Sequence, residues 1–301
     1  MLEPAISIRG LAKHYGRLVA VSDLTLDVSE GEVFGFLGLN GAGKTTTIRV
    51  LLDLIRPTRG HASIFGKDCQ AEGLAIRAAV GYLPGELGFY ADMTGEDILR
   101  LLARLGGRRV DAAWRRQLEA RFEFASSDLP RKLREYSSGM KRKLGLIQAF
   151  QADPALLMLD EPTEGLDPLM QEAFYDLLAE VKRRGHTVFL SSHILSEVER
   201  VCDRVAVLRT GRLALVAGVD EIRQLAPRRV RVMFAEAVQF RRELLPAPLE
   251  IVDIQPRSWR LHARGPLGPL IDALGGLPVS DLEVHEARLE DIIMKYYRDA
   301  S

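Results

Sequence analysis

The sequence is poor in cysteine, has no excess of either charge and contains no long apolar run. Its two cysteines, Cys69 and Cys202, lie far apart without metal-ligand spacing, which argues against a disulfide framework and indicates a reducing compartment. Lysine and arginine together number 41, as do aspartate and glutamate, so the basic excess of a dedicated nucleic-acid-binding protein is missing and no nucleic-acid partner is expected. No run of about 18 apolar residues is present, and Met1–Arg9 show no signal-peptide pattern. If the protein serves a membrane process, we expect the spanning part on another chain.

Apolar runs and helical periodicities alternate along most of the chain. A helix is predicted to start with residues 46–52, and further helices are predicted at 169–184 and 195–202. Strands are predicted at 5–9, 20–28, 33–37, 61–65, 80–86 (where the strand runs into a loop), 155–161, 187–191 and 205–208. The alternation predicts a doubly wound α/β fold, in which catalytic residues follow the carboxyl ends of parallel strands.

Two segments depart from this alternation. From the capping-box spacing of Thr94–Asp97 to about Gln151 the pattern is almost wholly helical, which predicts an inserted helical subdomain at about 86–152. After Pro227 the chain changes character. Strands are predicted there at 228–234, 249–254, 259–261 and 282–285, with helices at 267–274 and 289–297. We therefore predict a domain at 1–224 and a small α+β domain at 225–301.

The stretch Gly38–Thr45 fits the phosphate-loop pattern of two glycines followed by lysine and threonine, between a buried strand and a helix. Glycines let backbone N–H groups turn toward an anion, and the helix N-terminus adds partial positive charge. Lys44 is then suited to the β- and γ-phosphates, and the Thr45 hydroxyl to Mg²⁺. The predicted nucleotide-binding residues here are Gly38, Leu39, Asn40, Gly41, Ala42, Gly43, Lys44, Thr45 and Thr46.

Two carboxylates, Asp160 and Glu161, end the apolar run 155–161. Phosphoryl transfer depends mainly on positioned charge. Asp160 is suited to hold Mg²⁺ through its water shell, and Glu161 to orient or deprotonate an attacking water. The alternative is a solvated surface turn, which the phosphate loop makes much less attractive.

Three further features allow a functional and a plain interpretation. Ser137 and Gly139 precede a predicted helix, where they could bind an anion or simply cap the helix. The basic run Lys141–Lys143 could be a solvated face. Tyr15 could stack on a nucleotide base or be an ordinary loop residue.

Taken together, these motifs resemble the nucleotide-binding subunit of an ATP-binding-cassette (ABC) transporter over about residues 5–225, which implies a P-loop NTPase fold. Gly38–Thr45 matches the Walker A loop, and Leu156–Glu161 matches the Walker B strand with Glu161 as the catalytic glutamate. The remaining matches are Ser137-Ser138-Gly139-Met140 with the signature sequence, Gly165-Leu166-Asp167 with the D-loop, His193 with the switch histidine that contacts the γ-phosphate, and Tyr15 with the adenine-stacking aromatic residue.

The sequence departs from the usual family pattern in two places. Pro84-Gly85-Glu86 stands where the family usually has a glutamine, so that a contact from this loop to Mg²⁺ or water is in doubt. Glu86 is a candidate substitute at a shifted position, and whether it replaces the glutamine stays open. The signature carries Ser138 and Met140 and opens with Tyr136. This variant resembles exporter ATPases of the drug-resistance and natural-product (ABC-2) type, as does the C-terminal tail with Leu289–Ile293.

The resemblance implies a mechanism with two partners. Two copies meet head to tail, so that Ser137 and Gly139 of one copy complete the site at the phosphate loop of the other, and ATP closes the pair. Asp167 of the D-loop is a further expected nucleotide-binding residue. The helical subdomain and the Gly85–Tyr90 loop pass the motion to an integral-membrane permease, with Phe89 and Tyr90 as candidate contacts. The chain is then expected as a peripheral protein at the cytoplasmic face of the membrane. An importer ATPase, a soluble cassette ATPase acting on nucleic acid or ribosomes, and an ATP-driven clamp are the alternatives. The substrate, the permease and the role of 225–301 stay open.

Overall fold

The computed structural model describes residues 3–225, 227–242, 245 and 249–285. The chain divides into two compact units, Met1–Val216 and Ala217–Ser301. The division lies eight residues before the predicted boundary at 224/225, so the short helix α8 (Val219–Leu225) stands with the second unit. Each unit is described by itself.

The first unit is built on a six-stranded sheet of order β10-β9-β3-β8-β7-β6. The strands are β3 (Val33–Leu37), β6 (Val80–Leu83), β7 (Leu156–Asp160), β8 (Thr187–Ser192), β9 (Arg204–Arg209) and β10 (Arg212–Gly218). Every residue of β3, β7 and β8 is buried, as expected for parallel strands covered on both faces. Leu37 pairs with Ser192 and Asp160 pairs with Ser191, so the carboxyl ends of β3, β8 and β7 meet at one edge.

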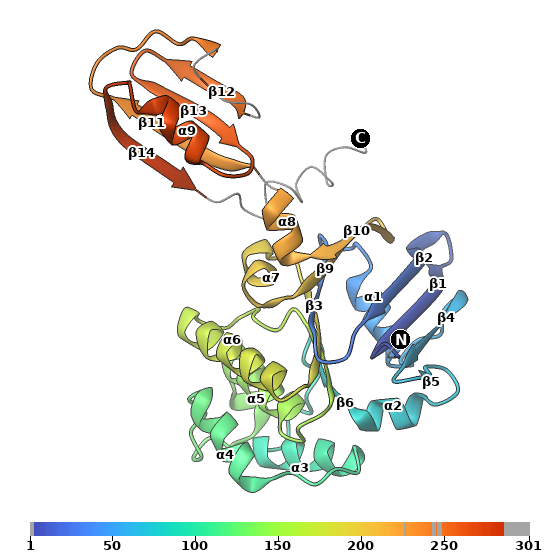
Figure 1. Cartoon of the computed structure of the whole chain (residues 1–301). Helices are drawn as coiled ribbons and strands as arrows, with labels where there is room; N and C mark the ends of the chain where they lie inside the picture. Colours follow the sequence, from blue (N-terminus) through green and yellow to red (C-terminus); the bar gives the residue numbers. More distant parts are fainter. Residues whose placement is uncertain (1–2, 226, 243–244, 246–248, 286–301) are drawn as a thin grey trace. The chain divides into compact units, whose positions relative to one another are not determined.

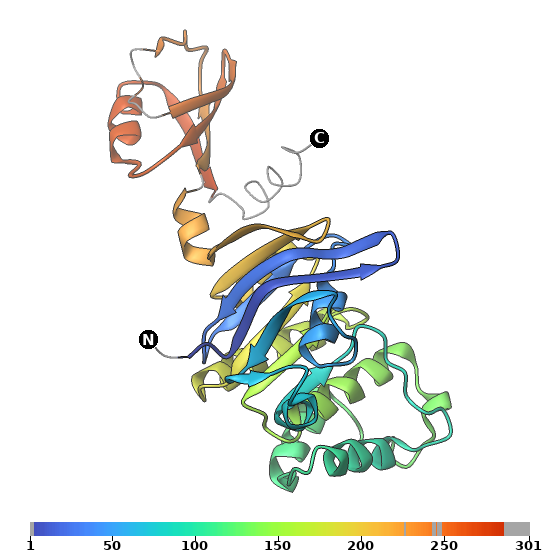
Figure 2. The ribbon, with the colours of Figure 1, turned by 90° about the vertical axis from the view of Figure 1, so that its right-hand side faces the viewer.

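A second, antiparallel sheet has the order β2-β1-β4-β5. Its strands are β1 (Ile6–Tyr15), β2 (Leu18–Val28), β4 (Arg59–Ile64) and β5 (Lys67–Asp68). The hairpin of β1 and β2 runs along one side of the unit (Figure 2). The strand predicted at 5–9 was too short, and Tyr15 is not a loop residue, because Lys13, His14 and Tyr15 pair with Val21, Val19 and Leu18 of the neighbouring strand.

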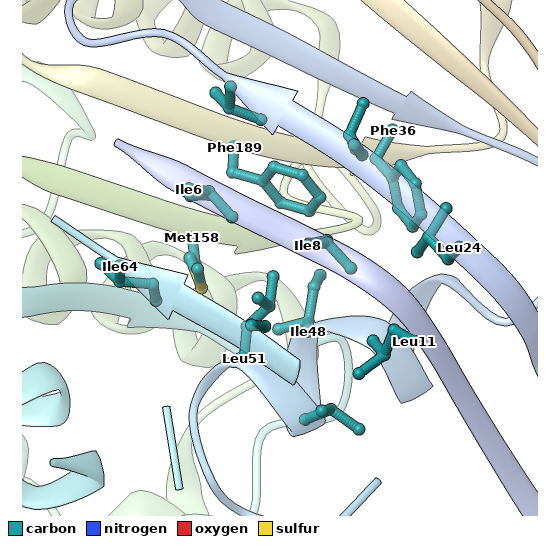
Figure 3. Close-up of a cluster of buried hydrophobic side chains, with 14 of the residues drawn as sticks. Ile6, Ile8, Leu11, Leu24, Phe36, Ile48, Leu51, Ile64, Met158 and Phe189 are labelled. Carbon is teal, nitrogen blue, oxygen red and sulfur yellow. The ribbon is translucent and has the colours of Figure 1, made fainter. Parts of the chain in front are cut away.

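One apolar core joins the two sheets through helix α1 (Lys44–Leu51). Figure 3 shows Ile6 and Ile8 of β1 beside Phe36, Phe189 and Met158 of the parallel sheet, with Ile48 and Leu51 of α1 in the same cluster. All seven side chains are fully shielded from solvent, and burying one such side chain stabilises the fold by about 1.5–3 kcal/mol. The core thereby anchors α1 directly behind the Gly38–Gly43 loop.

The helices of the first unit cover the parallel sheet and form the inserted segment. Helices α2 (Gly73–Ala79), α6 (Pro168–Arg183) and α7 (Leu195–Val201) belong to the sheet region, whereas α3 (Gly95–Leu105) and α4 (Ala112–Arg121) lie at one end of the unit (Figure 1). Helix α5 (Ser138–Phe150) contacts both α3 and β6 and so joins this end to the parallel sheet. Thr94 caps α3 by accepting a hydrogen bond from the N–H of Asp97, which confirms the predicted cap. The prediction of almost continuous helix was wrong for 122–137, where only a 3₁₀ turn at Leu133–Glu135 forms. A left-handed Glu123 (φ +48°) and Pro130 interrupt helical geometry there.

In its described residues the second unit contains, besides α8, a four-stranded antiparallel sheet of order β12-β13-β11-β14 and the helix α9 (Gly268–Leu274). Its strands are β11 (Arg228–Phe234), β12 (Leu249–Gln255), β13 (Ser258–Ala263) and β14 (Val279–His285). Its core centres on Trp259, whose ring lies 4.6 Å from Phe234 and 5.2 Å from Phe240 between ring centroids. The predicted helix at 289–297 and the segment Leu289–Ile293 lie outside the described residues. In the described parts of the chain no helix combines the length and apolar character needed to cross a membrane.

Candidate active site

The Gly38–Gly43 loop links the end of β3 to the start of α1, as the sequence predicts. Gly43 has φ +109°, and a Cβ there would lie 2.4 Å from the carbonyl oxygen of Ala20. A Cβ at Gly38 would lie 2.7 Å from the carbonyl oxygen of Leu208. Both distances are far shorter than a van der Waals contact, so these two positions require glycine.

Lys44, Glu161 and His193 form a connected charged group at this loop. Lys44 is only 6% exposed; its Nζ donates to the carbonyl oxygen of Gly38 at 2.5 Å and lies 3.1 Å from Glu161 Oε1. His193 Nδ1 lies 2.7 Å from Glu161 Oε2. Each oxygen of the Glu161 carboxylate therefore has one partner, and three residues far apart in sequence converge on one point.

Asp160 is 1% exposed. One of its carboxylate oxygens is vacant, in the sense that it accepts no hydrogen bond from the described residues. The Ser191 hydroxyl donates to Oδ1, whereas Oδ2 has no hydrogen-bond partner among the residues that the structure describes. An unpartnered buried carboxylate oxygen is costly unless a ligand satisfies it. Across the described ranges no group of three or more His, Cys, Asp or Glu side chains could hold a metal by itself.

A cavity of about 510 Å³ opens beside these groups. Its size is that of an ordinary small-molecule site. Tyr15 lies on its wall, 45% exposed, with the Lys13 ammonium 5.0 Å from its ring centroid. The predicted site residues that line it are Tyr15, Leu39, Asn40, Gly41, Ala42, Gly43, Lys44, Thr45, Thr46, Asp160 and Glu161, and Glu86 lines it as well.

Five predicted site residues do not line this cavity: Gly38, His193, Ser137, Gly139 and Asp167. Gly38 begins the phosphate loop and His193 contacts Glu161, whereas the other three lie in the two remaining motifs. Ser137 Oγ accepts a hydrogen bond from the N–H of Met140 at 3.2 Å and so caps α5. Asp167 Oδ1 accepts from the N–H of Met170 at 3.0 Å and caps α6. A Cβ at Gly139 would lie 3.6 Å from the carbonyl oxygen of Gly165, so the two predicted motifs are neighbours. Neither motif therefore contributes its predicted residues to the lining of the cavity of its own chain.

Two buried charged residues escaped the sequence analysis. Arg142, considered there as part of a solvated face, is 4% exposed. Glu197, in the first turn of α7, is 2% exposed and accepts the Ser192 hydroxyl at 2.5 Å on Oε2. Burial raises the pKa of Glu197, and the nearby Glu161 raises it further. Arg142 lies within the basic run Lys141–Lys143 and Glu197 lies in the polar first turn of a helix, so that neither position carries a sequence pattern that indicates burial.

Comparison with known proteins identifies the family. The ABC transporter family profile matches residues 21–164. Daunorubicin resistance ATP-binding protein DrrA3 of Streptomyces coeruleorubidus is 35% identical over 300 residues, covering 98% of this chain and 93% of that protein. Bacitracin transport ATP-binding protein BcrA of Bacillus licheniformis is 38% identical over 220 residues, covering 73% and 71%.

Solved structures agree with this assignment. An ATP-binding subunit of an ABC transporter is similar with a TM-score of 0.67 and 33% identity, covering 73% of this chain and 92% of that one. A dimeric bacterial ABC transporter cassette has a TM-score of 0.66 at 21% identity, covering 71% and 98%, and supports the P-loop NTPase fold alone. The chain therefore belongs to the ATP-binding proteins of ABC transporters and is an ATP-binding and ATP-hydrolysing protein of that family.

Proposed function

We propose that this chain hydrolyses ATP in the cavity beside Lys44 and Glu161 and thereby powers export of a drug or natural product through a separate permease. The observation that carries the proposal is the convergence of Lys44, Glu161 and His193 next to the vacant oxygen of Asp160. The export direction is supported by relatives named for daunorubicin resistance, for bacitracin transport and, in Burkholderia orbicola, for Nod factor export at 38% identity.

The catalytic roles follow from the charges at the site. Lys44 binds the β- and γ-phosphates of ATP, in exchange for its present contact with Glu161. Glu161 then orients and accepts a proton from the water that attacks the γ-phosphorus, while His193 contacts the γ-phosphate. Such positioned general-base help contributes about 10²–10⁴ in rate. Tyr15 stacks on the adenine at the open side of the cavity.

Mg²⁺ would be held by the Thr45 hydroxyl and, through water, by Asp160. Both residues line the cavity, and the vacant Asp160 Oδ2 supplies the acceptor that such a site needs. When bound, the ion neutralises charge on the β- and γ-phosphate oxygens. Glu86 also lines the cavity, and we do not assign it the role of the missing glutamine.

A second copy of the chain is proposed to complete the site. Ser137, Gly139 and Asp167 do not line their own cavity, and Ser137 and Asp167 begin helices whose N-termini attract anions. In a head-to-tail pair these termini reach the nucleotide of the partner. A single chain would then bind ATP but hydrolyse it well only when paired.

The permease is proposed to dock at a second, mostly apolar cavity of about 510 Å³ in the first unit. Leu87, Phe89, Leu102 and Leu105 are among its lining residues, and Tyr90 beside it is 70% exposed. A short apolar segment of a membrane protein fits such a surface. Docking there would hold the chain at the cytoplasmic face of the membrane.

The decisive test is ATP turnover of Glu161→Gln, with the exposed Glu30→Gln in the turn before β3 as the matched control. We expect Glu161→Gln to lose about 10²–10⁴ in kcat while still binding ATP, and Glu30→Gln to equal the parent chain. Turnover of Glu161→Gln near the parent value would refute its catalytic role. Purification after detergent extraction tests the partner, since a chain that never retains a membrane protein would argue against the transporter role.

A further inference from the structure

The guanidinium of Arg142 is buried against main-chain carbonyl groups beside the site. Arg142 is the fifth residue of α5, the helix that begins at Ser138. It is 4% exposed, although an arginine is almost always found at a surface unless it is paired. Burial lowers the pKa of Arg142, and the surrounding carboxylates of Glu164, Asp160, Glu161 and Glu197 oppose that shift. The residue stays charged, because an arginine does not lose its proton in proteins.

Its hydrogen bonds reach two segments that are remote from α5 in sequence. Nη2 donates to the carbonyl oxygen of Asp160 at 3.2 Å, and Nε donates to that of Pro162 at 3.1 Å. Nη1 donates to the carbonyl oxygens of Pro84 and Gly85, each at 3.1 Å. One side chain thereby connects the signature helix, the end of the catalytic strand and the loop after β6.

The carbonyl groups of Asp160, the last residue of β7, and of Pro162 flank Glu161 in the chain. Glu161 itself has φ +49°, a left-handed conformation that is strained for a residue other than glycine and persists only where the surroundings enforce it. Its N–H donates to the carbonyl oxygen of Ser191 at 3.1 Å, and Arg142 holds the residues on either side. The guanidinium is thus one of the groups that impose the orientation of the Glu161 side chain.

The loop residues that Arg142 contacts, Pro84 and Gly85, also lie close to the nucleotide cavity. Pro84 lines both the nucleotide cavity and the apolar cavity. A Cβ on Gly85 would lie 3.4 Å from Oδ2 of Asp160. Neither Pro84 nor Gly85 has a polar side chain, so their carbonyls are the groups by which another residue can hold this loop.

From these contacts we propose that Arg142 is a positioning residue, which fixes the backbone around Glu161 and ties the Pro84–Gly85 loop to it. This inference rests on the proposed ATPase function. A shift of α5 is then transmitted through one rigid guanidinium to the catalytic carboxylate and to the loop between the two cavities. A lysine cannot replace it, because an ammonium is a point donor, whereas the planar fork reaches several acceptors in fixed directions.

The test compares Arg142→Lys and Arg142→Ala with Arg116→Met, which removes an exposed arginine from α4. Because Arg142 contacts none of the phosphate-loop residues, we expect the Kd for ATP and the KM to stay within about threefold of the parent in both variants. We expect kcat to fall by about 10²-fold, the effect of misplacing a reacting group by an ångström. Guanidinium ion, added to Arg142→Ala far below denaturing concentrations, should restore part of the lost kcat. Arg116→Met should behave like the parent.

The outcomes separate this inference from the proposed function. If the parent hydrolyses ATP and Arg142→Lys keeps the parent kcat, the positioning role is refuted and the ATPase function stands. A fall in ATP affinity parallel to a fall in thermal stability would reduce Arg142 to general support of the fold and would also overturn the inference. If Arg142→Ala does not fold, the lysine variant alone decides. A parent chain without turnover, alone or with its permease, would overturn the proposed function and this inference with it.

Discussion

Replacing Ser191 by alanine tests the vacant oxygen of Asp160. Ser191 lies on β8, is fully buried and donates its hydroxyl to Asp160 Oδ1. The substitution removes that donor and leaves the backbone pairing of β7 with β8 in place. The carboxylate of Asp160, only 1% exposed, would then have no hydrogen-bond donor among the described residues at either oxygen.

The size of the effect follows from the charge of the acceptor. A hydrogen bond to a charged group contributes about 1.5–3 kcal/mol, so we expect Ser191→Ala to lose about 2 kcal/mol of unfolding free energy without ligand. For a unit of this size that loss lowers Tm by about 4–8 °C. Bound Mg²⁺ would give the carboxylate a new partner, and the loss should therefore shrink when Mg²⁺ and a non-hydrolysable ATP analogue are both present.

Urea unfolding followed by circular dichroism measures the loss of unfolding free energy without ligand and in the presence of Mg²⁺ and the ATP analogue. The control is Thr187→Val on the same strand, where the threonine Oγ1 accepts the N–H of Gly31 at 2.9 Å. A neutral hydrogen bond contributes about 0.5–1.5 kcal/mol, and its loss should be the same with analogue plus Mg²⁺ as with analogue plus chelator. If Ser191→Ala behaves like Thr187→Val in size and in indifference to Mg²⁺, then Asp160 is not the magnesium residue.

Two further predictions concern stability. Burial raises the pKa of Glu197 in the folded state, so the folded chain keeps a proton that the unfolded chain releases above the ordinary glutamate pKa. The stability that this proton contributes is fully present below the ordinary pKa. It is lost as the pH rises through the raised pKa of the folded state. We expect a decline of up to about 1.4 kcal/mol per pH unit in that window that Glu197→Gln abolishes, and urea titrations with the same slope in both proteins would contradict it. Trp259→Ala should cost the second unit about 3–5 kcal/mol by opening a cavity beside Phe234 and Phe240, whereas Ile271→Ala, at a position 53% exposed, should cost at most about 0.5 kcal/mol; calorimetry that shows equal losses would disprove the packing argument.

The elements that the sequence predicts well are those whose pattern depends on local chemistry. The strand at 228–234 has the bounds that its alternation predicts, and the Gly38–Thr45 loop lies between β3 and α1 as its glycines require. β1 was predicted too short, because the pairing of Tyr15 with Leu18 is decided by a partner strand and not by the residues of β1. Helix was likewise predicted too far at 122–137, where Pro130 in the sequence and the left-handed conformation of Glu123 in the fold both interrupt helical geometry.

The candidate site shows the same division. Glycine, lysine and paired carboxylates at fixed spacing identify Lys44, Asp160 and Glu161, since their chemistry resides in their side chains. Arg142 could not be identified in this way, because its partners are carbonyl groups that every residue carries. Its neighbours Lys141 and Lys143 are half-buried, so the three basic residues differ in the structure although they look alike in the sequence.

The position of Glu161 illustrates why a motif alone does not make a catalytic site. Its positive φ is unfavourable, and the groups that enforce it come from β8 through Ser191 and from α5 through Arg142. Its carboxylate is held by Lys44 from α1 and by His193 from the segment after β8. Because these supports come from separate segments of the chain, a displacement of any one of them moves the carboxylate relative to the others. The motif therefore supplies the reacting group, whereas the orientation of that group depends on how α5 and the parallel sheet are held together.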